Sequence, residues 1–429
     1  MNQDFISEKL DNGLRIFLRE IHAAPIVSHW VWYRVGSRDE VSGQRGLSHW
    51  VEHMQFKGTP KWPGSLMERS IARVGGAWNA FTHLDWTTFY ETLPANQLEI
   101  ALSIEADRMR NSIYESNEFE FERSVILSEK EGKDNDPFAR LNTAVVKAAF
   151  SLHPYQNDII GTDEDLHHIQ LNDLDRHYQN YYQPANALIA IAGDFESQII
   201  LEKIKQLYQS YPLAVISRPT IKPEMKIESS KEILMYGPGD MSFIQVAYRS
   251  PAAADPDFFA YTILDSLLSG PSSLNMFGGG GISNRTSRLY RRLVEKEYAV
   301  AVSGGLQATI DPYVYDLSIT LQPLQAPEIV LKKMDEEIEH LLTTKVKGKT
   351  IDRAIKQAAA LFAYGLESVT NQAFWIGYSE MFANYSWFNN YLDRLRDVHP
   401  RHVLEVAQKY LHPENRVVGF YQPETAKEG

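Results

Sequence analysis

Apolar residues recur at helical spacing in the stretch that lies between Gly46 and Gly58. Positions i, i+3, i+4 and i+7 fall on one face of an α-helix, and glycines commonly bound helices at their ends. The pattern therefore predicts a short amphipathic helix with a buried apolar stripe. The residues of that stripe are Leu47, Trp50, Val51 and Met54.

Two further segments carry clear patterns. Residues 118–132 are rich in glutamate and predict an acidic helix, whereas residues 77–90 follow the turn signal Gly75-Gly76 and alternate like a strand. The acidic helix needs an apolar side in order to pack. The residues expected to supply that side are Val125, Ile126 and Leu127.

The sequence contains an internal repeat, which predicts that the chain consists of two similar halves. Residues 181–194 and 410–421 both read Y-x-x-P-x-N followed by an apolar strand, with the prolines 229 residues apart (413 − 184). Residues 26–34 and 243–249 show a second, weaker similarity, since each reads as an alternating strand that leads into a helix-rich stretch. Such a period is too long for a solenoid and predicts two homologous domains, at residues 1–215 and 216–429. The proline-rich stretch 211–223 is the expected linker.

Composition narrows the class of protein. The chain has 44% hydrophobic and 23% charged residues, as in ordinary soluble proteins, and its net charge of −12 argues against nucleic-acid binding. No apolar stretch approaches the length of a membrane span, and no signal peptide is evident at the N-terminus. We therefore expect a cytoplasmic protein without a membrane partner. The absence of cysteine excludes disulfides and thiolate metal sites.

The predicted helix between the glycines carries a candidate metal site. His49-Trp50-Val51-Glu52-His53 reads H-x-x-E-H, and histidines four residues apart lie one turn apart on the same helix face. Both imidazoles can therefore reach one Zn²⁺, while Glu52 is placed to take a proton from water at the metal. The alternative is a partly buried helix whose two histidines are solvated or hydrogen-bonded.

A catalytic zinc site needs a third protein ligand and an open position for water. Without cysteine, the ligand must be His, Asp or Glu, and the acidic helix offers candidates. Glu122 and Glu129 lie seven residues apart and share a face. Spacing alone does not choose among Glu122, Glu129 and Glu131.

The first half of the chain resembles the M16 inverzincins, the family of pitrilysin, insulin-degrading enzyme and mitochondrial processing peptidase. Residues 46–59 are similar to the zinc helix of that family and its following turn, and residues 122–129 to its E-x6-E helix. The distance from His53 to Glu129 is 76 residues (129 − 53), which is the family spacing. The resemblance implies a zinc metalloendopeptidase with one Zn²⁺ bound by His49, His53 and Glu129. It also implies Glu52 as the general base and Glu122 as a supporting acid that orients the site.

A fourth similarity lies in residues 75–90. The matching strand of the family lies at the mouth of the site and binds extended substrate by main-chain hydrogen bonds. The resemblance therefore points to Asn79 and Ala80 as substrate contacts. The alternative is an ordinary strand with a half-buried asparagine.

The resemblance also implies the fold class: α+β, with two homologous domains that are each a mostly antiparallel sheet packed with helices. Two such domains form one half of a clamshell chamber in the family. A chamber of that kind selects oligopeptides or unfolded polypeptide segments.

The second half departs from the family at a pair of residues that grip substrate or the developing oxyanion. Aligned on Ser287-Arg-Leu and Glu295-Lys296, the arginine position holds Val294 and the tyrosine position falls near Ala301. A shifted alignment would instead offer Arg291 and Tyr298. The favoured alignment predicts the zinc subunit of a heterodimer, with a homologous partner supplying the Arg/Tyr pair; a homodimer is the alternative. The rival function is a non-catalytic structural or core-type subunit of a larger complex, although such subunits usually have a broken zinc motif.

Overall fold

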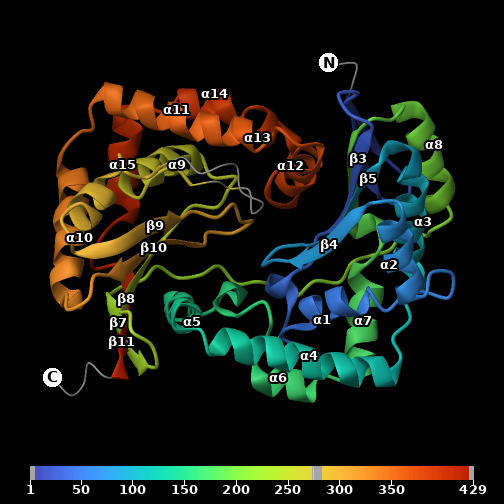
Figure 1. Ribbon diagram of the computed structural model, residues 1–429, viewed down its shortest axis with the longest axis horizontal. Helices are drawn as coiled ribbons and strands as arrows, with labels where there is room; N and C mark the ends of the chain where they lie inside the picture. Colours follow the sequence, from blue (N-terminus) through green and yellow to red (C-terminus); the bar gives the residue numbers. More distant parts are fainter. Residues whose placement is uncertain (1–4, 273, 275–282, 425–429) are drawn as a thin grey trace. The chain divides into compact units, whose positions relative to one another are not determined.

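The computed structural model describes residues 5–272, 274 and 283–424 and divides into two compact units (Figure 1). Each unit is assembled from three stretches of chain. The first contains Met1–Lys130, Asn157–Ile221 and Leu366–Phe388, and the second contains Glu131–Gln156, Lys222–Gly365 and Asn389–Gly429. None of the helices in the described part of the chain is long and apolar enough to cross a membrane.

The first unit is built on a six-stranded sheet in the order β1-β2-β6-β3-β5-β4. β2 pairs with β6 in parallel, whereas the other neighbours are antiparallel. The central β3 is rich in valine and aromatic residues, and all of it except its first residue is buried. The strands are β1 (Phe5–Lys9), β2 (Arg15–Glu20), β3 (Ile26–Tyr33), β4 (Ala77–Thr82), β5 (Thr87–Pro94) and β6 (Ala187–Gly193).

Helices cover this sheet and carry the residues of interest. They are α1 (Leu47–Met54), α2 (Gly64–Arg73), α3 (Leu98–Asn111), α4 (Ser116–Asp134), α6 (Asp163–His168), α7 (Leu171–Tyr181), α8 (Ser197–Tyr208), α12 (Val369–Phe382) and α13 (Tyr385–Asn389).

The second unit has a five-stranded sheet in the order β7-β11-β8-β10-β9. Here β7 pairs with β11 in parallel, and the other neighbours are antiparallel. The strands are β7 (Lys231–Gly237), β8 (Phe243–Arg249), β9 (Ala299–Gly305), β10 (Val314–Leu321) and β11 (Arg416–Pro423). The helices are α5 (Pro137–Ala149), α9 (Asp257–Leu268), the π-helical turn η5 (Tyr290–Val294), α10 (Pro327–Thr343), α11 (Gly348–Tyr364), α14 (Tyr391–Arg396) and α15 (Pro400–Tyr410).

The two sheets repeat one topology. The order β2-β6-β3-β5-β4 matches β7-β11-β8-β10-β9 strand by strand, including the single parallel pair. Both Y-x-x-P-x-N stretches lead into the strand that pairs in parallel, β6 in one sheet and β11 in the other. The predicted α+β class, with mixed sheets packed with helices, is therefore confirmed. The division at residues 215 and 216 stays a prediction about the homologous halves.

Each half of the chain also contributes a helix to the other unit. α12 comes from the second half but packs against β3 and β6, whereas α5 comes from the first half and packs against β11 and β8. Gly377 of α12 lies so close to Trp32 that a Cβ there would be 2.0 Å from the indole nitrogen. The close approach of α12 to the sheet thus requires glycine at this position.

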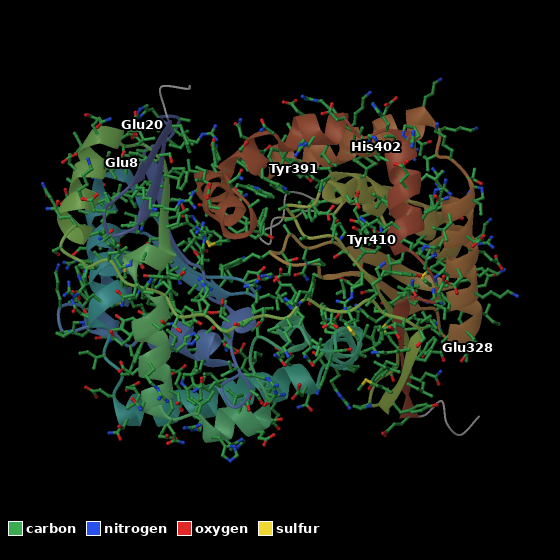
Figure 2. All side chains as sticks on the ribbon, turned by 180° about the vertical axis from the view of Figure 1, so that it is seen from behind. Glu8, Glu20, Glu328, Tyr391, His402 and Tyr410 are labelled. Atoms are coloured by element: carbon green, nitrogen blue, oxygen red, sulfur yellow. The ribbon has the colours of Figure 1, made fainter. Side chains whose placement is uncertain are left out.

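Helix α9 is buried along nearly its whole length, from Phe258 to Leu268. Its aromatic residues pack against two tyrosines that are labelled in Figure 2. The ring of Phe259 lies 5.8 Å from that of Tyr391, and the ring of Tyr261 lies 5.5 Å from that of Tyr410. This helix therefore belongs to the core of the second unit.

Two local expectations were wrong. Residues 77–90 form a hairpin of β4 and β5 rather than one strand, because the chain turns at residues 83–86. Val125 is 37% exposed, since the buried face of α4 is instead formed by Phe119, Glu122 and Ile126. Leu127 is partly buried, so the acidic helix turns a narrower apolar face to the core than expected.

Candidate metal centre

Helix α1 begins at a tightly fixed N-terminus. Its N-cap, Gly46, has φ of 96°, and a Cβ there would lie 2.3 Å from the carbonyl oxygen of Ile160. The buried Glu40 carboxylate accepts hydrogen bonds of 2.7 Å from the backbone N–H groups of Gly46 and Ser48. Burial raises the pKa of Glu40 to about 7, although these two hydrogen bonds oppose the shift. The first turn of α1 is therefore held by a carboxylate as well as by packing.

The predicted apolar stripe of α1 is buried, and this fixes the direction of its polar face. Leu47, Trp50, Val51 and Met54 are all 2% exposed or less. The opposite side of the helix presents His49 and His53, whose rings lie 4.5 Å apart. The prediction of an amphipathic helix over this stretch is confirmed.

Three potential metal ligands converge where α1 meets α4. His49 Nε2 and His53 Nε2 lie 3.2 Å apart, and Oε2 of Glu129 is 3.7 Å and 3.6 Å from them. Among the described residues, this is the group of three His, Asp or Glu side chains that could hold a metal ion. For four ligands around Zn²⁺ at about 2.0–2.1 Å, neighbouring ligand atoms are separated by roughly 3.3 Å. The donor types and their spacing therefore fit zinc.

A carboxylate and a lysine fix the ring of His53. Its Nδ1–H donates to Oε1 of Glu122 at 2.9 Å, which leaves the Nε2 lone pair directed toward His49 and Glu129. Oε2 of Glu122 pairs in turn with Lys57 Nζ at 2.6 Å. The hydrogen bond from His53 is the main reason why the pKa of Glu122 is lowered.

The charge around His53 favours an ordered ring. Burial by itself lowers the pKa of His53, but the hydrogen bond to Glu122 and the charges of Glu52, Glu122 and Glu129 raise it overall. An acidic shell of this kind attracts cations. The negative charge around His53 and the converging ligand atoms therefore both favour a bound cation.

Glu52 projects from the same face of α1 and is held by the edge strand of the sheet. Oε2 of Glu52 accepts a hydrogen bond of 2.6 Å from the Thr82 hydroxyl at the end of β4. Burial raises the pKa of Glu52 to about 7, against the opposing effects of Thr82 and His53. Oε2 is thus engaged by the Thr82 hydroxyl, and an ionised carboxylate has further lone pairs that can accept a proton.

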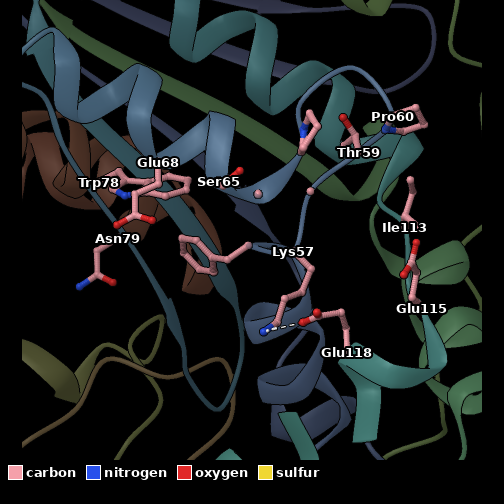
Figure 3. Close-up of a pocket in the computed structure, with 14 residues that line it drawn as sticks. Lys57, Thr59, Pro60, Ser65, Glu68, Trp78, Asn79, Ile113, Glu115 and Glu118 are labelled. Carbon is pink, nitrogen blue, oxygen red and sulfur yellow. Dashed lines mark ion pairs between the residues drawn. The ribbon is translucent and has the colours of Figure 1, made fainter. Parts of the chain in front are cut away.

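The strand β4 forms an edge of the first sheet, and it carries both predicted substrate contacts. Asn79 is exposed and its Oδ1 accepts from the Ala80 N–H at 2.9 Å, whereas the Ala80 side chain is buried. Asn79 also lines a cavity of 830 Å³ that is shared by β4, the turn after α1 and the start of α4. Figure 3 shows Trp78 and Asn79 on one side of this cavity and the ion pair of Lys57 with Glu118 on another.

The structure thus brings together His49, Glu52, His53, Glu122 and Glu129, as the sequence predicts. Glu131 is exposed and lies outside the group of possible metal ligands. The residues that sequence reasoning missed are Glu40, Lys57 and Thr82. Only Lys57 had a sequence signal, since it follows His53 by one helical turn.

The residues considered for the Arg/Tyr pair lie in the second unit. Val294 ends η5, and Ala301 pairs with Thr320 inside the β9–β10 ladder. Arg291 is exposed on η5, and Tyr298 is half-buried just before β9.

Comparisons with known proteins found family models and relatives that cover most of the chain. Residues 15–163 match the family described as Insulinase (Peptidase family M16), and residues 168–358 match the Peptidase M16 inactive domain. The zinc protease PqqE of Helicobacter pylori is 26% identical over 431 residues, which cover 97% of this chain and 92% of that protein. An uncharacterized zinc protease of Streptomyces coelicolor is 25% identical, with 96% and 88% covered. The crystal structure of a protease from Helicobacter pylori superimposes with a TM-score of 0.89 at 25% identity, covering 98% of this chain and 99% of that one. The chain belongs to the M16 family of peptidases, and these relatives are named zinc proteases or proteases.

Proposed function

We propose that the chain is a zinc metalloendopeptidase that hydrolyses oligopeptides or unfolded polypeptide segments. The observation that carries the proposal is the convergence of two imidazole nitrogens and a carboxylate oxygen beside the Glu52 carboxylate. A scaffold subunit has no use for a complete set of ligands together with a base. The intact constellation therefore favours the enzyme over the non-catalytic alternative.

The roles of the side chains follow from their contacts. His49, His53 and Glu129 would hold Zn²⁺, and a bound zinc supplies Lewis acidity that makes water more acidic and polarises a peptide carbonyl. Glu52 Oε1 takes the proton of the attacking water and returns it to the amine of the leaving group. Glu122 holds His53 in the tautomer that presents Nε2, and Lys57 holds Glu122.

The edge of β4 is the proposed binding surface for the peptide backbone. An extended peptide can add to an unpaired edge by main-chain hydrogen bonds, and it would exchange the bond between Asn79 Oδ1 and the Ala80 N–H for one of its own. The 830 Å³ cavity beside Asn79 has room for a substrate side chain. Because a peptide must be extended in order to pair with β4, folded proteins should be poor substrates.

The proposal is tested by measuring zinc content and hydrolysis of unstructured peptides on the same purified sample. We expect about one zinc per chain, and activity that falls by about 10²–10⁴-fold in Glu52→Gln while zinc is retained. Glu131→Gln is the matched control, since this exposed glutamate lies on α4 outside the ligand group. A zinc-free chain, or an equally active Glu52→Gln variant, would contradict the proposal.

We also propose that a homologous subunit completes the active enzyme by supplying an arginine and a tyrosine. The support is Val294 at the position where the resembling sequences carry arginine, and the placement of Ala301 within a sheet ladder. The chain with zinc but without its partner should then hydrolyse peptides slowly, and the mixture of both chains rapidly. A homodimer of this chain with full activity would exclude the heterodimer.

A further inference from the structure

The second unit contains a cavity of 440 Å³ that no part of the proposed peptidase function uses. It lies between η5, α10 and the start of α11, with the buried Leu267 of α9 in its wall. Eight of the nine lining residues are polar or charged, and five of them are basic. Its residues are Leu267, Thr286, Arg288, Arg291, Arg292, Lys296, Glu337, Thr350 and Arg353.

The charge of this lining is opposite to that of the whole chain. Five cationic side chains and the carboxylate of Glu337 line the cavity, and Glu336 pairs with Arg292 from beside it, which leaves a local net charge of +3 (5 − 2) although the chain carries −12. Like charges gathered around one space repel each other, which opposes folding unless counter-charge is supplied. A bound anion would supply that counter-charge.

Two of the arginines are held in place by acidic residues of α10. Arg288 Nη1 lies 2.6 Å from Glu337 Oε1 and 3.1 Å from His340 Nδ1, and Arg292 pairs with Glu336. Fixed guanidinium groups lose less side-chain entropy when they bind a ligand. These two arginines therefore form an ordered side of the cavity.

The other three cations have no acidic partner within the part of the chain that the structure describes. Arg291, Lys296 and Arg353 make no ion pair with any residue described there, and all three are exposed. They come from η5, the turn after it and α11, so their convergence depends on the fold rather than on one run of basic sequence. This arrangement differs from a solvated basic helix face, which would present its charges along a single element.

Hydroxyl groups complete the lining. Thr350 lies in the first turn of α11, where the positive end of the helix dipole also favours anions. Gln357 donates to Thr286 Oγ1 at 3.4 Å, which leaves the hydroxyl proton of Thr286 available as a donor. Arginine forks combined with hydroxyl donors are the usual partners of phosphate oxygens.

We propose that this cavity binds a small molecule carrying a diphosphate group. Three cations without an acidic partner exceed what a single carboxylate or phosphate would compensate, and 440 Å³ falls in the size range of small-molecule sites. The ligand is recognised by its charge and its phosphate oxygens. The inference is independent of the proposed metal centre, because it uses none of its residues, and Arg291 enters the peptidase proposal only through the alternative alignment.

The test is calorimetric titration of the full chain with pyrophosphate, ADP and inorganic phosphate at physiological salt. The test variant is Arg291→Gln/Arg353→Gln, which removes two exposed, unpaired cations without touching the core. The control variant is Arg396→Gln/Arg401→Gln, which removes two exposed arginines elsewhere in the second unit. We expect pyrophosphate to bind wild type and control alike, and the test variant at least tenfold more weakly, with an unchanged melting temperature.

Because pyrophosphate also binds zinc, the titration is repeated on the His53→Ala variant. Binding that persists there and is weakened by the paired Arg291 and Arg353 changes supports the cavity. Tighter binding of ADP would assign a nucleotide, and equal binding would assign the diphosphate group alone. No binding at about 1 mM pyrophosphate, which is weaker than roughly −4 kcal/mol, would overturn the proposal. So would equal loss in the control variant, or loss with His53→Ala alone.

Discussion

Helices α1 and α9 occupy the same place in two sheets of the same topology, yet they have opposite character. α1 follows β3 and turns His49, Glu52 and His53 toward α4, whereas α9 follows β8 and is buried from Phe258 to Leu268. The one acid buried in α9, Asp265, is fully engaged by hydroxyls of Ser269, Ser272 and Tyr315. The same sheet topology thus carries a helix with potential metal ligands in the first unit (α1) and a fully packed core helix in the second (α9).

The helices that follow show the same contrast. α4 precedes the exchanged helix α5 and brings Glu122 and Glu129 to the metal centre, while α11 precedes the exchanged helix α12 and buries apolar residues. The buried residues of α11 are Ile351, Ala354, Ala358 and Leu361. A candidate metal centre therefore needs suitable side chains on two helices at once, and among the described residues the first unit alone combines them.

The largest expected effect comes from breaking the reactive helix. His53→Ala removes a proposed metal ligand, so bound zinc and peptide hydrolysis should both fall to background. Zinc content and peptide turnover are measured on the same preparation. His167→Ala is the control, because that exposed imidazole hydrogen-bonds to the Asp163 carbonyl of its own helix. Full zinc occupancy in His53→Ala would show that His53 is not a metal ligand, and α1 would then not differ from α9 in metal binding.

A substitution in the buried helix α9 should lower the stability of the protein and leave its zinc affinity unchanged. Leu264 is 0% exposed on α9, and Leu264→Ala should lower the free energy of unfolding by about 2–5 kcal/mol through lost burial and a cavity. Denaturant unfolding gives the stability, and zinc titration gives the affinity. A loss of zinc affinity in the folded variant would show that α9 has more than a structural role.

The contact between Glu122 and His53 allows a smaller and more specific test. Glu122→Gln should weaken zinc binding by about 10–100-fold, since the amide is a poorer acceptor for the His53 Nδ1–H. Competition with a chelator of known affinity measures the effect. Glu120→Gln serves as control, because Glu120 lies on the same helix and pairs with Arg123 instead. Equal zinc affinity in both variants would contradict the orienting role of Glu122.

The smallest expected effect concerns Thr82. Thr82→Val keeps the shape of the side chain but removes the hydroxyl that holds Glu52, and kcat should fall by about tenfold or more with KM and zinc content unchanged. Thr82→Ser should restore most of the activity, because it retains the donor. A valine variant with the kcat of wild type would show that Thr82 does not position the base.

Local patterns predicted the elements that carry the metal centre, because each pattern is set by contacts within a few turns of helix. The stripe from Leu47 to Met54 and the shared face of Glu122 and Glu129 are of this kind. The α+β class followed from the family resemblance, whereas the duplicated strands predicted two homologous domains. Choosing Glu129 over Glu131 required the resemblance, since one helix offers several glutamates at suitable spacing.

Long-range packing explains what the sequence did not predict. Thr82 reaches Glu52 because β4 lies beside α1. Glu40 is a local contact by comparison, but it depends on the turn that precedes α1 rather than on helical spacing. The exchange of α5 and α12 depends on tertiary fit, including the contact of Gly377 with Trp32. The basic cavity could not be predicted from the sequence either, because its cations come from separate elements.

The assignment of His49, His53 and Glu129 to a zinc ion is tested most directly by zinc K-edge X-ray absorption on the purified, zinc-loaded chain, with Glu129→Gln for comparison. We expect one zinc with two imidazole nitrogens and carboxylate or water oxygens at about 2.0–2.2 Å. The imidazole signal should persist in Glu129→Gln while affinity drops. A chain that binds no zinc, or a zinc without two imidazole ligands, would contradict the assignment of His49 and His53 to the metal.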